Sequence, residues 1–357
     1  MKKYFILAAA AVVAIAACSK NEIESSNTPK EISFNAVTAK NQVTKAINDK
    51  TYYAPTDPAF GVWGLYQATN WSTNHSNSVW VGSDASTSAQ ISYADNTWKN
   101  AASVDYWPIT GSLVFMGYSP YVNVSGNAAI AVTDNKATLT VTNFQTTTGD
   151  WVDDLMWSDA VEKTANDTNY DADGSNTTTY NGVPIVFHHA LSQIAVYAKT
   201  DKDYAAEDYT FTITGLSVTV DDNATLTVAD DLSADPTVTW TEPATDATRT
   251  VLSAASAALT TSYVKQGESF LVIPQTLTAA QDIITVTYQV VHNGVTSTAT
   301  KNISLTAGDS VALSAFAKNT KYNLNLVFSI DEIKYSPDVV DWETETTSEY
   351  EVPADAS

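Results

Sequence analysis

The feature that most constrains this 357-residue chain is the alternation of apolar and polar residues, which recurs in short runs along most of its length. Apolar residues at every second position turn one face of an extended strand toward a core and the other toward water. Asn293-Gly294 separates two of these runs, and this dipeptide favours the tight turn of a β-hairpin. The runs span residues 32–36, 139–142, 211–213, 216–220, 270–273, 283–291, 296–305 and 322–328. We therefore expect an all-β chain of stacked antiparallel sheets.

The composition changes near the middle of the chain. Residues 165–183 are rich in Asn, Asp, Thr and Gly, and apolar runs resume at Ile185. Most of the tryptophans precede this stretch. We expect two tandem β-sandwich domains at residues 31–183 and 184–342, followed by a polar tail at residues 343–357.

The first 17 residues have the pattern of a lipoprotein signal peptide. Two lysines precede an apolar run of fourteen residues, which is shorter than the roughly 20 residues that span a bilayer. The run ends in Ile15-Ala16-Ala17-Cys18, which looks like a bacterial lipobox, and Cys18 is the only cysteine. We expect removal of residues 1–17, lipidation of Cys18, a flexible tether at residues 18–30, and attachment to the outer membrane through acyl chains.

Composition argues against several functional classes. The formal net charge is −22 and Arg249 is the only arginine, so a nucleic-acid surface, which needs clustered Lys and Arg, is not expected. A single cysteine excludes disulfides within the chain and zinc–thiolate clusters. His188 and His189 are adjacent, so on a strand they face opposite sides and cannot chelate one ion together. With no nucleophile motif or acid–base constellation in view, we expect neither an enzyme nor a cofactor.

Two binding sites remain as weaker alternatives. Asn169, Asp171 and Asp173 precede Gly174 with the spacing of a calcium loop, but Tyr180 stands where the closing glutamate belongs, so a turn-forming linker is favoured. The aromatic-rich first half could instead bind glycans as a monomeric surface lipoprotein. Core packing is the commoner role of large aromatics, and Trp71, in a polar loop, is the least core-like of them.

Several short motifs occur in one order along the chain. They are Glu31–Ala36, Thr44-Lys45-Ala46, Phe60–Trp63, Tyr106-Trp107-Pro108, Asp154–Trp157, Phe187–Ser192, Phe270–Gln275 and Val339–Trp342. Together with the lipobox, this series resembles the fimbrillin family of Bacteroidetes, the lipoprotein-derived pilins of surface fimbriae.

The resemblance implies two transthyretin-like β-sandwich domains and a route of assembly into fimbriae with other pilin subunits, identical or different. A trypsin-like protease cuts the outer-membrane precursor in the loop after the first strand, and a strand of another subunit fills the groove that is left. Here the displaced strand carries Ile32, Phe34 and Ala36, which alternate with polar residues. Its loss would uncover an apolar trough and unpaired backbone groups, and strand addition would satisfy both.

The cleavage site departs from the best-known members, which are cut after arginine. The basic residues of the loop are lysines, and Lys45 has the context of the family's site, with Lys40 and Lys50 as alternatives. Either the protease accepts lysine, or the first strand stays in its groove. If the strand stays, the chain is a membrane-proximal anchor.

The candidate donor strand is residues 330–342, which follow a final strand at residues 321–328. Its anchors would be Ile333, Tyr335, Val339 and Trp342. The alternative is that this segment pairs at home and closes its own sheet.

Overall fold

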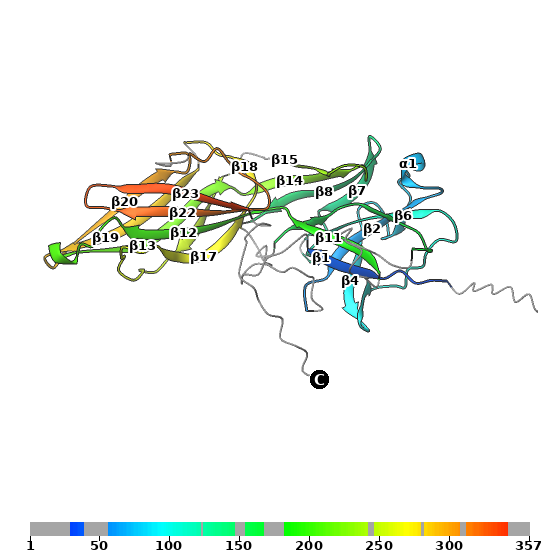
Figure 1. Cartoon of the computed structure of the whole chain (residues 1–357), viewed down its shortest axis with the longest axis horizontal. Coiled ribbons are helices and arrows are strands. Elements are labelled where there is room, and N and C mark those ends of the chain that lie inside the picture. Colours follow the sequence, from blue (N-terminus) through cyan, green and yellow to red (C-terminus); the bar gives the residue numbers. More distant parts are fainter. Residues whose placement is uncertain are drawn as a thin grey trace, which may run out of the picture.

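The computed structural model describes residues 29–38, 56–122, 124–146, 154–167, 182–241, 246–279, 282–307 and 312–341. Strands dominate these residues and form two lobes that follow each other along the longest axis (Figure 1). Helical structure in the described ranges is limited to α1 (Trp71–Asn74) and the 3₁₀ turn η1 (Ala205–Glu207). The prediction of an all-β chain is confirmed. No helix in the same ranges has the length and apolar character needed to cross a membrane.

One nine-stranded sheet forms the frame of the N-terminal lobe. Its strands are β1 (Phe34–Thr38), β2 (Phe60–Gln67), β3 (Val79–Val81), β4 (Ala89–Ala94), β5 (Thr97–Asn100), β6 (Ser112–Ser119), β9 (Met156–Ser158), β10 (Val161–Lys163) and β11 (Val183–His189). The order β6–β9–β11–β1–β5–β4–β2 closes on itself, because β2 also pairs with β6. β1 is therefore an interior strand of a closed ring.

A second sheet crosses the division that the sequence predicted at residues 183/184. Its strands are β7 (Ala128–Thr133), β8 (Lys136–Gln145), β14 (Asn223–Asp230) and β15 (Thr237–Thr241), in the order β15–β14–β8–β7. Leu226 and Val228 of β14 share a core with Trp63 of β2. β11 also pairs with the N-terminal strands. The sheets thus do not separate at residue 183. Composition along the chain could not reveal this, because it carries no record of strands that pair far apart in the sequence.

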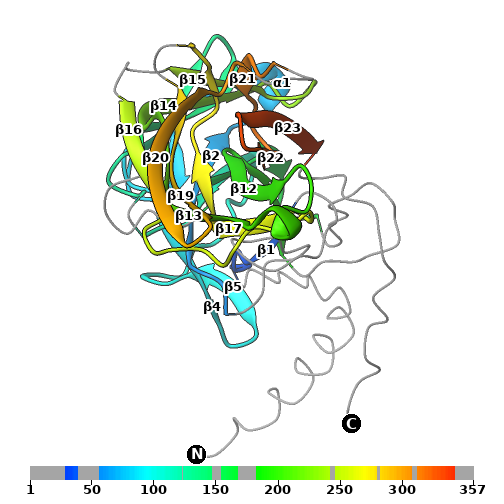
Figure 2. The same ribbon diagram turned by 90° about the vertical axis from the view of Figure 1, so that its left-hand side faces the viewer.

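The C-terminal lobe stacks two four-stranded sheets around one core, as the end-on view in Figure 2 shows. One sheet has the order β17–β12–β22–β23 and the other β16–β13–β19–β20. The bounds are β12 (Ser192–Thr200), β13 (Tyr209–Asp221), β16 (Asp246–Leu252), β17 (Val264–Val272), β19 (Ile283–His292), β20 (Val295–Ser304), β22 (Thr320–Phe328) and β23 (Ile333–Asp341), with β18 (Gln275–Thr276) pairing with β21 (Ala315–Phe316) beside them.

Strand directions agree with the prediction in most pairs. The hairpin expected at Asn293-Gly294 joins β19 to β20, and both turn residues have positive φ, of 51° and 76°. Two pairs, β1–β11 and β12–β22, are parallel and not antiparallel. The alternation of side chains fixes which face of a strand is buried but not the direction of its neighbour.

Candidate functional site: the groove occupied by the first strand

β1 is held on both of its edges. It runs parallel to β11 over five pairs, from Phe34↔Val183 to Thr38↔Phe187. On its other edge it pairs with β5 only once, at Phe34↔Trp98. The ring closes around β1, so removal of this strand would leave two unpaired edges facing each other.

The residues just before β1 are held by the loop that joins β5 to β6. The Ile32 N–H donates to the carbonyl of Asp105 at 2.8 Å, and the Trp107 N–H donates to the carbonyl of Lys30 at 2.9 Å. The ammonium group of Lys30 also donates to the carbonyl of Ala165 at 2.8 Å. Burial raises the pKa of the Asp105 carboxyl group, against a smaller lowering by the hydrogen bond from Asn100.

The three alternating apolar side chains of the first strand lie in the core of the lobe. Ile32, Phe34 and Ala36 are 4%, 1% and 2% exposed. The ring of Phe34 meets that of Phe115 edge-on, with centroids 5.6 Å apart. Burying one Ile or Phe side chain stabilises a fold by about 1.5–3 kcal/mol, so these two side chains contribute roughly 3–6 kcal/mol before ordering costs.

Gly182 lets β11 begin directly against β1. Its φ is +115°, a region that side chains rarely adopt. A Cβ at this position would lie 2.8 Å from the backbone nitrogen and from the carbonyl carbon of Phe34. The close contact of the two strands therefore depends on glycine here.

The predicted donor segment pairs with a strand of its own chain. β23 forms nine pairs with β22, from Phe328↔Ile333 to Thr320↔Asp341, and is the outermost strand of its sheet. Ile333 and Tyr335 are 8% and 2% exposed in the core of the C-terminal lobe, whereas Val339 is 49% exposed. Use of this segment as a donor therefore requires its release, and the donor role stays a prediction.

Tyr335 is an imperfect fit in that core. Its hydroxyl group is buried, and within the described part of the chain it has no hydrogen-bond partner. Burial raises the pKa of this phenol. A buried polar group without a partner costs about 1–3 kcal/mol, so β23 is held at home less tightly than its buried area suggests.

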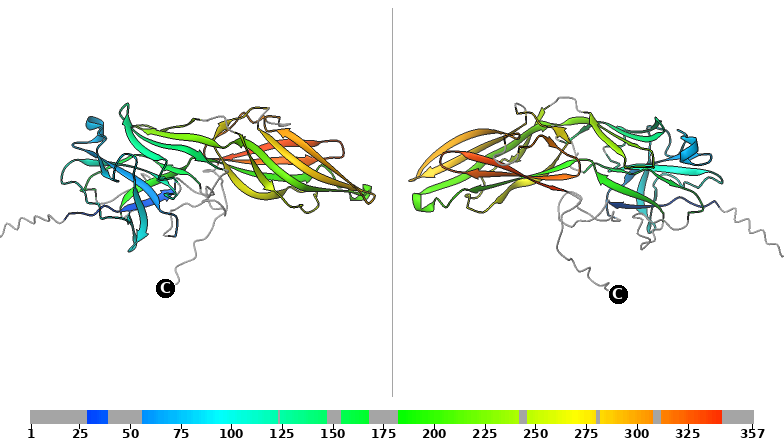
Figure 3. Two further views of the ribbon diagram at one scale, coloured as in Figure 1. Left: turned by 180° about the vertical axis from the view of Figure 1, so that it is seen from behind. Right: turned by 45° about the horizontal axis from the view of Figure 1, so that its top comes forward.

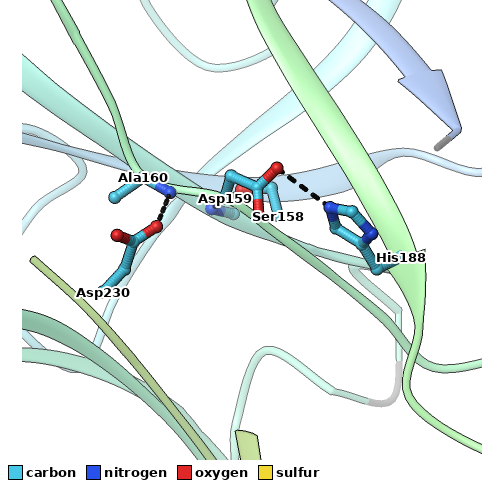
Figure 4. Close-up of polar contacts among 6 residues, drawn as sticks. Ser158, Asp159, Ala160, His188 and Asp230 are labelled. Carbon is cyan, nitrogen blue, oxygen red and sulfur yellow. Dashed lines mark hydrogen bonds and ion pairs between the residues drawn. The ribbon is translucent and has the colours of Figure 1, made fainter. Parts of the chain in front are cut away.

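The two adjacent histidines end β11, and their side chains point to opposite faces of the sheet. Each contacts β9 or a residue next to it. His188 Nε2 lies 2.9 Å from Asp159 Oδ2 (Figure 4), and its ring stacks on Trp157 with centroids 4.5 Å apart. His189, which is buried, pairs through Nδ1 with the buried Asp154.

Neighbouring polar side chains accept hydrogen bonds from backbone N–H groups. Asp230, whose pKa burial raises, accepts the Ala160 N–H at 2.7 Å (Figure 4). Ser158 Oγ accepts the Gly117 N–H at 2.8 Å, inside the sheet. These contacts hold backbone segments in place.

Several predicted site residues lie outside the described ranges. They are Cys18, Lys40, Lys45, Lys50, Asn169, Asp171, Asp173 and Trp342. Among the residues that the structure describes, no group of three or more His, Cys, Asp or Glu side chains could hold a metal ion.

The tryptophan expected to be least core-like is in the core. Trp71 is only 3% exposed, which corrects that prediction, because its backbone N–H donates to Glu162 at 2.6 Å and draws the short helix α1 against the sheet. Trp80 of β3 is exposed instead, at 44%. Its Nε1 donates to the Tyr106 carbonyl at 2.7 Å, and its ring lies 5.5 Å from that of Tyr66. The polar residues on either side of Trp71, Asn70 and Ser72, do not indicate its burial, whereas Trp80 stands between Val79 and Val81.

Comparison with known proteins gives the family. A family model described as fimbrillin-like matches residues 44–342, most of the chain. The chain belongs to the fimbrillin-like family. This match confirms the resemblance found in the sequence.

A solved structure shares this fold at low sequence identity. A fimbrial protein from Bacteroides vulgatus is 17% identical, with a TM-score of 0.56 over 88% of this chain and 99% of its own. The fimbrial anchor protein Mfa2 from Porphyromonas gingivalis is 10% identical, with a TM-score of 0.30 over 88% of this chain and 98% of its own. No curated protein matches the chain.

Proposed function

We propose that this fimbrillin-like chain is a structural subunit of cell-surface fimbriae that polymerises by donor-strand exchange and supports adhesion. The observation that carries the proposal is the position of β1 inside a closed ring, with Ile32, Phe34 and Ala36 buried. A strand in that position cannot leave without exposing an apolar groove and two open sheet edges. Strand addition by another subunit restores both the side-chain packing and the backbone pairing.

The side-chain order of β23 fits the groove of β1. In the first strand, Ile32, Phe34 and Ala36 are a branched aliphatic, an aromatic and a small residue at every second position. Ile333, Tyr335 and Pro337 follow the same order in β23. We therefore place Ile333 in the position of Ile32, with the donor strand parallel to β11.

Pro337 is compatible with this register. Even-numbered residues of the first strand turn their backbone groups away from β11, as the bond from Ile32 N–H to Asp105 indicates. β5 pairs with β1 only at Phe34, so no β5 residue of the described chain pairs with Ala36. A proline in that position loses no ladder hydrogen bond to β5.

The remaining parts of the proposal concern location and processing. The subunit reaches the outer membrane as a lipoprotein acylated on Cys18, and a trypsin-like protease that accepts lysine releases the first strand after Lys45. Arg249, the only arginine, supports lysine as the cut residue, because it lies within β16 and its guanidinium group donates to the carbonyl of Thr146. The two lobes correspond to two tandem transthyretin-like domains, which the paired four-stranded sheets of the C-terminal lobe support.

Treatment of the purified chain with a lysine-specific protease tests the proposal. We expect release of a fragment ending at Lys45, followed by a ladder of oligomers on a gel. A variant with Lys40, Lys45 and Lys50 all replaced by Gln should lose both, whereas Lys136→Gln, at the start of β8, should keep both. Release of the fragment without oligomers, or a ladder that persists in a chain truncated at Phe328, would contradict donor-strand exchange by β23.

A further inference from the structure

The direction of β1 determines from which side a replacing strand must come. β1 is parallel to β11, and the dark blue segment that leads into it reaches the N-terminal lobe from the end away from the C-terminal lobe (Figure 1). A donor strand in the proposed register follows the same direction. It therefore enters from that same outer end, and the body of its subunit lies beyond it.

The connection between the donor strand and its own subunit is short. Five residue steps separate Phe328, the last residue of β22, from Ile333. An extended chain covers at most 3.3–3.6 Å per residue, so Phe328 of the donor must come within about 17 Å of the place of Ile32 in the acceptor. The donor body is thus brought against whatever surrounds the start of β1.

Four exposed apolar side chains, which we call the end patch, lie on the loop that pairs with the start of the first strand and on the strand hydrogen-bonded to that loop. The end patch consists of Trp80, Val104, Tyr106 and Ile109, which are 44%, 53%, 41% and 95% exposed. Three of these residues belong to the loop that pairs with residues 30–32, since Tyr106 forms a β-bridge with Glu31. The hydrogen bond from Trp80 to the Tyr106 carbonyl joins the fourth to the same loop. Exposed apolar side chains gathered in this way are typical of protein–protein contacts.

The matching surface on the donor is the turn between β22 and β23, residues 329–332, which we call the donor turn. While β23 pairs with β22, the Ser329 N–H donates to the Glu332 carbonyl at 2.9 Å and closes this turn, with Ile330 47% exposed. Release of β23 opens the turn into the extended connection to the donor strand, and Ile330 stays on that connection. The Tyr204 hydroxyl group accepts the Ile330 N–H at 3.3 Å, which joins the turn to the residues next to η1. The end of the C-terminal lobe that bears this turn points away from the N-terminal lobe (Figure 3).

We infer that the end patch is the docking surface for the donor turn of a second copy of this chain. The inference rests on the donor-strand exchange proposed above and adds a second contact to it. Consecutive copies then meet end to end along the long axis, with the C-terminal lobe of one against the N-terminal lobe of the next. Because the chain is strongly acidic, with a formal net charge of −22 over its full length, an uncharged contact at the junction limits the repulsion between copies.

Two measurements on the protease-treated chain separate the docking contact from strand exchange. The first is binding of a synthetic peptide of residues 333–341, which contains the donor strand without the donor turn. The second is the rate at which whole subunits form oligomers, followed by light scattering. We compare Ile109→Asp with Thr298→Asp, which adds the same charge to an exposed position of β20.

Loss of a central apolar contact typically weakens an interface by about tenfold, so Ile109→Asp should slow oligomer formation by about that factor and leave peptide binding within about twofold. Thr298→Asp should change neither. The docking inference would be overturned if Ile109→Asp and the unaltered chain formed oligomers at the same rate. It would also be overturned if Thr298→Asp slowed oligomer formation as much as Ile109→Asp does, or if Ile109→Asp weakened peptide binding to the same degree as oligomer formation. Failure of the peptide to bind the unaltered chain would instead overturn the proposed strand exchange.

Discussion

β1 and β23 have the same order of side chains but opposite surroundings. β1 is enclosed by neighbours on both edges, and Phe34 lies among apolar side chains. β23 pairs on one edge only and buries the Tyr335 hydroxyl without a partner. Of the two strands, β1 is thus the harder to remove and precedes the lysine-containing loop, whereas β23, near the C-terminal end, can leave more readily. In the proposed strand exchange, this difference in attachment sets the direction.

The largest expected effect is on the packing of β1. Phe34→Ala should lower the free energy of unfolding of the N-terminal lobe in the uncut chain by about 3–5 kcal/mol, because it leaves a cavity in a core without room to collapse. Urea denaturation followed by tryptophan fluorescence measures it. Val339→Ala, at an exposed position of β23, is the matched control and should change stability by less than about 0.5 kcal/mol. A loss below 1 kcal/mol for Phe34→Ala would mean that the groove is not filled as described.

The next effect concerns the contact between β1 and β11. Gly182→Ala places a Cβ against the Phe34 backbone and forces a positive φ on alanine, so we expect a loss of about 1–3 kcal/mol, measured in the same way. Gly126→Ala is the control, because nothing lies within 4 Å of a Cβ there. If both variants have the same stability, the close approach of β11 to β1 is not a constraint.

A smaller effect, of opposite sign, is expected in β23. Tyr335→Phe removes the unpartnered hydroxyl group and should stabilise the C-terminal lobe at home by about 1 kcal/mol. Since release of β23 must then overcome a tighter packing, oligomer formation after cleavage should become slower. Hydrogen exchange of β23 amides measures the first effect and light scattering the second. Faster exchange in Tyr335→Phe would show that the hydroxyl group contributes to home packing.

The smallest effect depends on pH. Burial raises the pKa of Asp105 above 3.8, so the folded chain retains this proton to higher pH than the unfolded chain does. Stability from this group is present below pH 3.8 and is lost as pH rises through the raised pKa. Asp105→Asn should therefore be as stable as the unaltered chain at pH 3, and slightly more stable, by less than about 1 kcal/mol, at pH 7. Chemical denaturation at both pH values measures the difference, and a variant that is less stable at pH 7 would contradict this assignment.

The sequence predicts individual strands better than it predicts their neighbours. The alternation at Ile32, Phe34 and Ala36 is a local property, and it predicts correctly which side chains are buried. The pairing of β14 with β8 is not local, so a change of composition near residue 183 could not reveal that the sheets cross there. For the same reason, the parallel direction of β1 and β11, on which the proposed polarity of the fibre depends, becomes visible only in the fold.

In the candidate site, too, local patterns could be predicted from the sequence, whereas contacts between distant residues could not. The alternating residues of the displaced strand could be found from sequence, and so could the matching order in β23. The exposure of Trp80 and the burial of Trp71 could not, since they depend on hydrogen bonds to Tyr106 and Glu162, which lie 26 and 91 residues away.

An engineered disulfide tests most directly whether β23 of one subunit occupies the place of β1 in the next. In the proposed register Asp338 takes the place of Val37, which pairs with Val186 of β11, whereas at home it pairs with Asn323. In a chain without Cys18, the variant Asp338→Cys with Val186→Cys should form disulfide-linked oligomers only after cleavage at Lys45. Lys334→Cys with Val186→Cys, displaced by four residues, should not. Two results would contradict this register: oligomers of the first variant that contain no disulfide, or disulfide-linked oligomers of both variants. A disulfide that forms before cleavage would show that β1 need not leave.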